Sequence, residues 1–138
     1  MEYFPYDHLV IDDFFPLERA QKLSQEFPAY DDPKWFFYNN PLEKKKTINN
    51  WYDFPPETYK TFTLLNSDEF INMLSEKTGI EYLYPDIGLH GGGWHIHSRG
   101  GKLNIHLDYS IHPKTGLQRK LFAPPFVECI TCTTKCIN

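Results

Sequence analysis

Two stretches in the second half of the chain decide the expected fold: Trp94-His95-Ile96-His97 and Leu103-Asn104-Ile105-His106-Leu107-Asp108-Tyr109. In both, apolar and polar residues alternate, which is the period of a β-strand with one buried face. Ser98-Arg99-Gly100-Gly101 lies between them and has the composition of a tight turn. The pattern predicts two antiparallel strands, the second with its apolar side chains facing the core (Leu103, Ile105 and Leu107).

Upstream of these strands the spacing of apolar residues indicates three helices. The first is expected from Pro16 and Leu17 to Phe27, where Pro28 ends it. A second is predicted over about residues 57–65. A third is predicted over 67–78, with Ser67 as the N-cap and Gly79 as the stop. Its buried face is expected to comprise Phe70, Ile71 and Leu74.

The remaining segments have weaker patterns. Residues 8–15 and 80–85 are interpreted as short strands, and 88–93 as a glycine-rich loop. Residues 28–58 are expected to be irregular but packed, with an extended piece at 35–38 and the basic run Lys44-Lys45-Lys46 in a solvated loop. A turn is predicted at 112–116 and a third strand from 117 to 122. The expected class is α+β, with helices first and antiparallel strands after them.

The composition indicates a globular protein. Apolar residues make up 41% of the 138 residues, aromatic residues 17% and charged residues 23%, with a net charge of −4. No basic stripe favours nucleic acid, and no apolar run approaches the roughly 20 residues of a membrane helix. The N-terminus lacks the pattern of a secretory signal. We therefore expect a cytoplasmic protein that binds neither nucleic acid nor membrane.

Histidine is concentrated in one part of the chain, which suggests metal binding. Five of the six histidines lie between residues 90 and 112. Within this region, His106 and Asp108 are two residues apart on a predicted strand, so their side chains point to the same face. An imidazole and a carboxylate so placed can bind one ion, as in the facial sites of iron(II) oxygenases. A His-x-Asp motif alone also occurs by chance on solvent-facing strands.

The surrounding sequence closely resembles the prolyl-4-hydroxylase-like branch of the iron(II)- and 2-oxoglutarate-dependent oxygenases. The shared features over 84–121 are Pro85-Asp86, the glycine loop 91–93, the Gly100-Gly101 turn, the His106-x-Asp108 strand, and His112-Pro113 followed by basic residues. The start of the chain, Ile11-Asp12-Asp13-Phe14-Phe15-Pro16, is also similar to that family's entry segment. The likeness extends from about residue 7 to Leu121.

The resemblance implies a double-stranded β-helix (a jelly-roll, cupin-like fold) preceded by helices, of which this chain holds an incomplete part. It implies iron(II) as cofactor, 2-oxoglutarate and O2 as co-substrates, and hydroxylase-type oxidation of a small molecule or a protein side chain. His106 and Asp108 would be the first two iron ligands. Residues expected to line the cavity are His95, His97, Asn104 and Tyr109.

The sequence departs from the family after Leu121. The third iron ligand, a downstream histidine, and the basic residue that holds 2-oxoglutarate have no counterpart, because no histidine follows His112 and no arginine follows Arg119. We therefore divide the chain into an oxygenase-like part, 1–121, and an atypical tail, 122–138. The tail is interpreted as the product of a truncated or frame-shifted gene, so the isolated chain is expected to be inactive.

Several alternatives remain open at the level of sequence. The tail contains Cys129, Cys132 and Cys136, whose three thiolates would need only one more ligand to hold zinc. His95, His97 or His112 could replace the missing iron ligand, although cavity lining is the expected role of the first two. The chain could also be a non-catalytic remnant that associates with itself through an open sheet edge.

Overall fold

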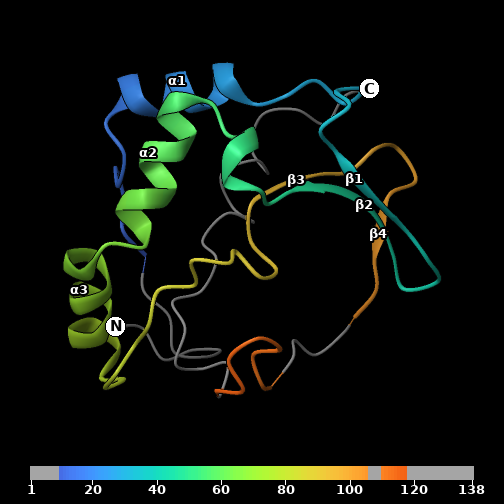
Figure 1. The fold of residues 1–138 in the computed structure, drawn as a ribbon. Helices are drawn as coiled ribbons and strands as arrows, with labels where there is room; N and C mark the ends of the chain where they lie inside the picture. Colours follow the sequence, from blue (N-terminus) through green and yellow to red (C-terminus); the bar gives the residue numbers. More distant parts are fainter. Residues whose placement is uncertain (1–9, 106–109, 118–138) are drawn as a thin grey trace.

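The computed structural model describes residues 10–105 and 110–117. Within them the elements follow the order α1 (Leu17–Glu26), β1 (Phe36–Asn39), β2 (Glu43–Ile48), a 3-10 helix η1 (Trp51–Asp53), α2 (Pro56–Leu65), α3 (Asp68–Thr78), β3 (Trp94–Ile96) and β4 (Lys102–Leu103). The fold is α+β, with the helices on one side of the molecule and the antiparallel sheet on the other (Figure 1).

The three helices form where the sequence predicts them. The Ser67 hydroxyl accepts the Phe70 amide at 3.2 Å and so caps α3. At the other end Gly79 has a φ of +70°, a left-handed conformation that glycine adopts without strain. Pro56 begins α2, where its missing N–H has no partner to lose. Phe70, Ile71 and Leu74 are buried, as expected.

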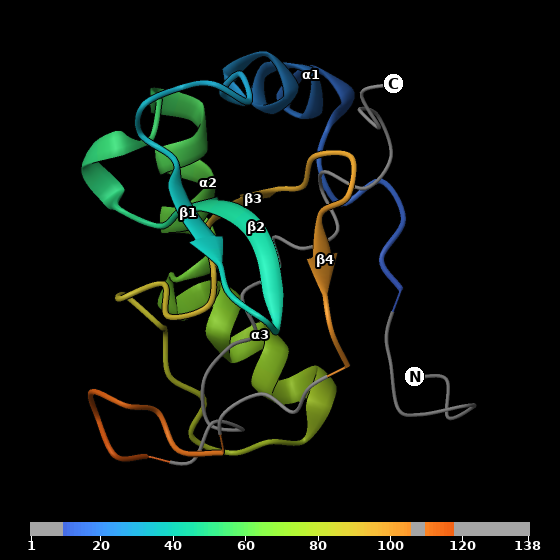
Figure 2. The same ribbon diagram turned by 90° about the vertical axis from the view of Figure 1, so that its right-hand side faces the viewer.

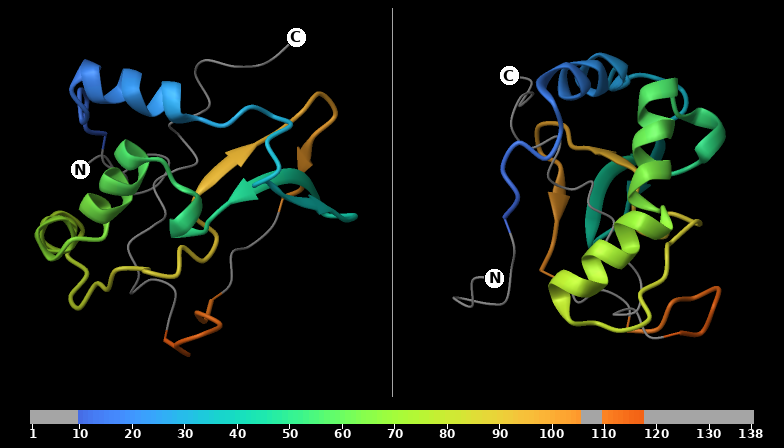
Figure 3. Two further views of the ribbon diagram at one scale, coloured as in Figure 1. Left: turned by 45° about the horizontal axis from the view of Figure 1, so that its top comes forward. Right: turned by 90° about the vertical axis from the view of Figure 1, so that its left-hand side faces the viewer.

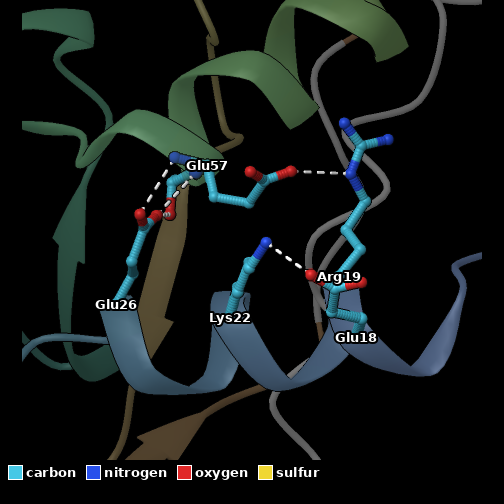
Figure 4. Close-up of polar contacts among 6 residues, drawn as sticks. Glu18, Arg19, Lys22, Glu26 and Glu57 are labelled. Atoms are coloured by element: carbon cyan, nitrogen blue, oxygen red, sulfur yellow. Dashed lines mark hydrogen bonds and ion pairs between the residues drawn. The ribbon is translucent and has the colours of Figure 1, made fainter.

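A carboxylate from α1 caps the N-terminus of α2 (Figure 4). Glu26 accepts hydrogen bonds from the backbone amides of Glu57 and Thr58, at 2.9 and 2.7 Å, and from the Thr58 hydroxyl at 2.8 Å. Nearby, Arg19 Nε donates to Glu57 at 2.8 Å, and this hydrogen bond lowers the pKa of the Glu57 carboxyl. The two helices are thus joined by charged groups as well as by packing.

The sheet is centred on β2. Strand β1 pairs with one edge of β2, in the register Phe36 to Thr47 and Asn39 to Lys44. On the other edge Trp94 pairs with Ile48, and further along the same edge Leu103 pairs with Glu43. Figure 2 shows β2 between β1 and β4, and Figure 3 gives two further views.

The predicted turn at 98–101 does not reverse the chain. Strands β3 and β4 both run antiparallel to β2 and follow one another along it, from the Ile96–Lys46 pair to the Lys102–Lys44 pair. The expected hairpin between them is therefore wrong. Residues 97–101 instead form an outward loop in one interrupted strand, in which Gly101 donates its amide to Ser98 O at 2.8 Å.

The basic run Lys44-Lys45-Lys46, expected in a loop, lies inside the central strand β2. Consecutive lysines carry no apolar alternation, so the pattern did not indicate a strand. The structure stabilises the run through specific partners. Lys46 Nζ donates to Tyr30 O at 2.6 Å and lies 3.9 Å from the centre of the Tyr30 ring, while Lys45 Nζ is 3.2 Å from Glu43.

Other expectations are also corrected. Strands β1 and β2 precede α2 and α3, so the helices do not all come first. Residues 10–15 form no strand, and 80–85 form a turn followed by a single bridge residue at Tyr84. Leu103 is 41% exposed and Ile105 fully exposed, so these two side chains do not anchor the predicted strand in the core, and Leu107 lies outside the described residues. The predicted strand 117–122 lies outside the described residues except for Leu117.

Two hydrophobic clusters hold the described part together. The aromatic cluster joins the sheet, η1, α2 and the glycine-rich loop, and its buried members are Trp35, Ile48, Phe54, Phe62, Leu89 and Trp94. The aliphatic cluster lies between α2 and α3, and its buried members are Leu65, Phe70, Ile71 and Leu74. The aromatic residues at 35–38 and 51–54 are divided between the core and the surface. Trp35 and Phe54 are buried, whereas Phe36, Phe37 and Tyr52 are exposed.

Candidate functional site

The predicted ligand pair His106 and Asp108, and the predicted cavity residue Tyr109, lie outside the described residues, as do all three cysteines. The placement of His106 and Asp108 on one face of a strand therefore stays a prediction. Within residues 10–105 and 110–117, no group of three or more histidine, cysteine, aspartate or glutamate side chains could hold a metal ion.

The three described residues expected to line a cavity are each held by a different part of the backbone. His95 lies on β3 opposite Thr47, is half-buried, and has Nε2 3.3 Å from Gly92 O. His97 is exposed, and its ring lies against Gly101. Asn104 is also exposed. It donates its backbone amide to Leu42 O at 2.9 Å and its side-chain amide to Pro41 O at 3.4 Å.

A buried polar pair lies elsewhere, at Asp86 and His112. The two residues are 7% and 3% exposed, and Asp86 Oδ1 is 3.5 Å from His112 Nε2. Asp86 Oδ2 accepts the backbone amide of His90 at 3.0 Å, and the rings of His90 and His112 lie 5.4 Å apart, centre to centre. We call these three residues the Asp86–His112 cluster.

The His112 ring also organises the turn that follows it. Its Nδ1 faces the backbone amides of Lys114 and Thr115, each at 3.3 Å, and accepts from both. Because Nδ1 is an acceptor, a neutral ring carries its hydrogen on Nε2, the atom that faces Asp86. Two backbone bonds close the turn, from Gly116 N to His112 O at 2.9 Å and from His112 N to Leu117 O at 2.8 Å.

Asp86 helps to fix the glycine-rich loop. Its carbonyl accepts the Leu89 amide at 2.9 Å, and Leu89 O accepts the Gly92 amide at 2.9 Å. Leu89 has a φ of +46°, which costs a side-chain-bearing residue roughly 1–2 kcal/mol, yet its side chain is buried in the aromatic cluster. Burial of this leucine offsets the strain, so the loop is anchored at both Asp86 and Leu89.

The close approach of Gly93 to β2 completes the loop. A Cβ at Gly93 would lie 2.2 Å from the Ile48 carbonyl oxygen, and the residue has a φ of +99°. The indole of Trp51 donates to Ile87 O at 2.7 Å, which ties the loop to η1. The predicted glycine loop is therefore confirmed, and it is packed against the sheet.

Sequence reasoning missed the Asp86–His112 cluster because its members come from two segments far apart in the chain. His112 was interpreted as a turn residue and Asp86 as part of a family-like motif, and both interpretations miss the contact between them. The available signal was local: a histidine at the first position of His112-Pro113-Lys114-Thr115-Gly116 can accept amides from the following turn, as aspartate and asparagine do.

Comparisons with protein-family models, curated proteins and solved structures found no match to this chain. No helix in the described ranges has both the length and the apolar character needed to cross a bilayer.

Proposed function

We propose that this chain carries the N-terminal part of an iron(II)- and 2-oxoglutarate-dependent oxygenase domain, in which His106 and Asp108 supply two iron ligands. The observation that supports the proposal is the order of features over 84–121. A Pro-Asp segment, a triple-glycine loop, a Gly-Gly turn, a His-x-Asp motif and a His-Pro turn with basic residues follow one another as they do in the prolyl-4-hydroxylase-like branch.

The donor set is chemically suited to iron(II). An imidazole and a carboxylate are two of the three groups in a facial triad, and they leave open positions for exogenous oxygen ligands. In a complete domain the bound iron, with 2-oxoglutarate and O2, would supply the oxidising chemistry for hydroxylation. In this chain Asp108 would contribute the anionic ligand and His106 the neutral one. His95, His97, Asn104 and Tyr109 are proposed to line the space beside them.

The 138 residues contain no histidine after His112 and no arginine after Arg119. With two protein ligands the ion would stay mostly solvated, so we expect this chain to bind iron(II) weakly and not to turn over 2-oxoglutarate by itself. The double-stranded β-helix belongs to the same proposal. Its support is the open antiparallel sheet, whose strand β4 leads directly toward the His106-x-Asp108 motif.

Anaerobic calorimetric titration with iron(II) tests the proposal. Wild-type protein should bind weakly, and Asp108→Ala should remove the binding because it deletes the only proposed anionic ligand. Asp31→Ala is the matched control, since it removes one exposed carboxylate far from the motif in sequence. Equal binding by wild type and Asp108→Ala would refute the assignment. Iron-dependent release of succinate from 2-oxoglutarate by the chain alone would refute the expected lack of turnover.

A second candidate is a small zinc module in the tail, favoured by the occurrence of all three cysteines in the last ten residues. Replacing Cys129, Cys132 and Cys136 together by serine separates the two functions. The oxygenase proposal expects iron(II) binding to be unchanged by the triple substitution. Tight zinc binding that the substitution abolishes, without iron binding at His106 and Asp108, would favour the zinc module.

A further inference from the structure

The His112 ring is a buried titratable group on which the turn 112–116 depends. The residue is 3% exposed, and its Nδ1 accepts the backbone amides of Lys114 and Thr115, each at 3.3 Å. An imidazole nitrogen accepts a hydrogen bond only while it carries no proton, and both nitrogens of a protonated ring are donors. These two hydrogen bonds therefore exist only while the ring is uncharged.

The opposite nitrogen of the ring faces a carboxylate. Asp86 Oδ1 is 3.5 Å from His112 Nε2, and Asp86 is 7% exposed. This separation is longer than an ordinary hydrogen bond of about 2.7–3.2 Å, but it lies within the range of an ion pair. When the ring is protonated, the approach can shorten to a charge-assisted hydrogen bond of about 2.7–2.9 Å. A protonated ring thus gains a partner at Nε2 and loses two at Nδ1.

Other titratable groups of the described chain lie beside this pair. A Cβ at Gly88 would lie 3.5 Å from Asp86 Oδ1 and 3.8 Å from Lys114 Nζ, so the ammonium and the carboxylate approach the same point. The rings of His90 and His112 lie 5.4 Å apart, centre to centre. Protonation of His112 would bring a second positive charge to the carboxylate that Lys114 already approaches. Repulsion between the two cations then favours displacement of the turn that carries Lys114.

The turn can be released without opening the rest of the fold. Residues 113–117 are exposed, and neither Asp86 nor His112 belongs to the aromatic or the aliphatic cluster. The backbone hydrogen bond from Gly116 N to His112 O does not involve the ring. Protonation therefore acts on the amides of Lys114 and Thr115, which lose their acceptor, and leaves the hydrophobic core in place.

We propose that His112 is a pH-sensitive switch for the turn 112–116. The uncharged ring holds the turn through Nδ1. The protonated ring releases it, because Nδ1–H then faces two other donors, and pairs with Asp86 through Nε2. Histidine side chains change charge between about pH 5 and pH 8, so the change is expected in this range. This switch goes beyond the proposed function and does not depend on it.

The test follows amide hydrogen exchange in the full chain by NMR between about pH 8 and pH 5. Each rate is divided by the intrinsic exchange rate at the same pH, since exchange itself depends on pH. Protection of Lys114 and Thr115 should fall about tenfold toward acid pH, in step with the titration of the His112 ring measured by its nitrogen chemical shifts. The Ile71 amide, which bonds to Ser67 O in the first turn of α3, should keep its protection.

A matched pair of substitutions isolates the ring. In His112→Asn the side-chain oxygen can accept the two amides, as asparagine does in turns, and takes up no proton in this pH range. This variant should keep its protection at acid pH. His97→Asn makes the same change at an exposed histidine and should respond to pH like wild type.

Three results would overturn the proposal. The first is constant protection of Lys114 and Thr115 in wild type while the His112 ring titrates. The second is a ring that stays uncharged until the protein unfolds. The third is an equal loss of protection in folded His112→Asn. If His112→Asn does not fold, the wild-type comparison between ring titration and amide protection decides by itself.

Discussion

The aromatic and aliphatic clusters hold the molecule together in different ways. The aromatic cluster collects side chains from β2, η1, α2, the glycine-rich loop and β3, with the Phe54 and Phe62 rings stacked at 4.8 Å. The aliphatic cluster takes its buried members from α2 and α3, which are adjacent in sequence. Only the aromatic cluster includes the glycine-rich loop, through Leu89. The glycine-rich loop, which follows Asp86, therefore packs on the aromatic cluster and not on the aliphatic one.

The largest expected effect comes from Trp94, at the centre of the aromatic cluster, where its ring packs edge-on against Phe27 at 4.8 Å. Trp94→Ala should lower the free energy of unfolding by about 4 kcal/mol. Leu74→Ala, in the aliphatic cluster, should cost about 2–3 kcal/mol. Urea denaturation followed by circular dichroism measures both values.

The comparison is sharper by hydrogen exchange. Leu74→Ala should speed amide exchange mainly in α3, whereas Trp94→Ala should speed it in the sheet, in α2 and in the glycine-rich loop together. If Leu74→Ala speeds amide exchange in the sheet as strongly as in α3, the two clusters form one cooperative unit and do not act separately.

Gly93 tests the packing of the glycine-rich loop on β2. In Gly93→Ala the new methyl group would lie 2.2 Å from Ile48 O and 2.9 Å from Asn49 Cα, both backbone atoms. Because alanine also adopts a positive φ at a cost, we expect the free energy of unfolding to fall by about 3 kcal/mol, as measured by thermal denaturation. Gly91→Ala is the control, since Gly91 also has a positive φ but has no atom within 4 Å of the added Cβ. The free energy of unfolding of Gly91→Ala should fall by only about 1 kcal/mol.

Some parts of the fold could be predicted from the sequence. The helices were predictable because their signals are local: apolar spacing, Ser67 as a cap and Gly79 as a stop. Strand β2 was not predictable, because Lys44-Lys45-Lys46 has no apolar alternation and Lys46 is held by Tyr30, a residue 16 positions away that no sequence pattern places beside it. The loop between β3 and β4 has the composition of a hairpin turn. The direction of the chain after its two glycines is decided by the pairing of β4 with β2, which the local sequence does not show.

The candidate site divides in the same way. The glycine-rich loop could be recognised from composition alone. The contact between Asp86 and His112 could not, since two polar residues in separate turns have no spacing that signals a shared buried position. The ligand pair His106 and Asp108 stays a prediction from the i, i+2 rule for strands.

Glu26 tests the helix that the two clusters share, because α2 contributes Phe62 to one and Leu65 to the other. Glu26→Ala removes three hydrogen bonds from the N-terminus of α2 and should cost about 2 kcal/mol. Glu26→Gln should recover part of the loss, because its amide oxygen can still accept. Glu18→Ala, which removes an exposed carboxylate from the same helix, is the control and should be close to neutral. Equal losses in Glu18→Ala and Glu26→Ala would exclude a capping role.

The smallest expected effect is electrostatic and lies at the same joint, between Arg19 and Glu57 (Figure 4). The Arg19 hydrogen bond lowers the pKa of Glu57 below its ordinary value of 4.5. A carboxyl whose pKa is lower in the folded state stabilises the protein above its unfolded-state pKa, and this contribution is lost as the pH falls through the folded-state pKa. Arg19→Met should therefore be less stable than wild type at neutral pH, with the difference shrinking below about pH 4.5. Lys22→Met, at the exposed Glu18 pair, should show a smaller difference of the same sign, because Lys22 also lowers the pKa of Glu57 by its charge; this contribution should largely disappear in about 1 M salt. A difference between Arg19→Met and wild type that stays constant down to acidic pH would assign the role of Arg19 to packing on Phe15, whose ring centre lies 5.9 Å from the guanidinium, and not to Glu57.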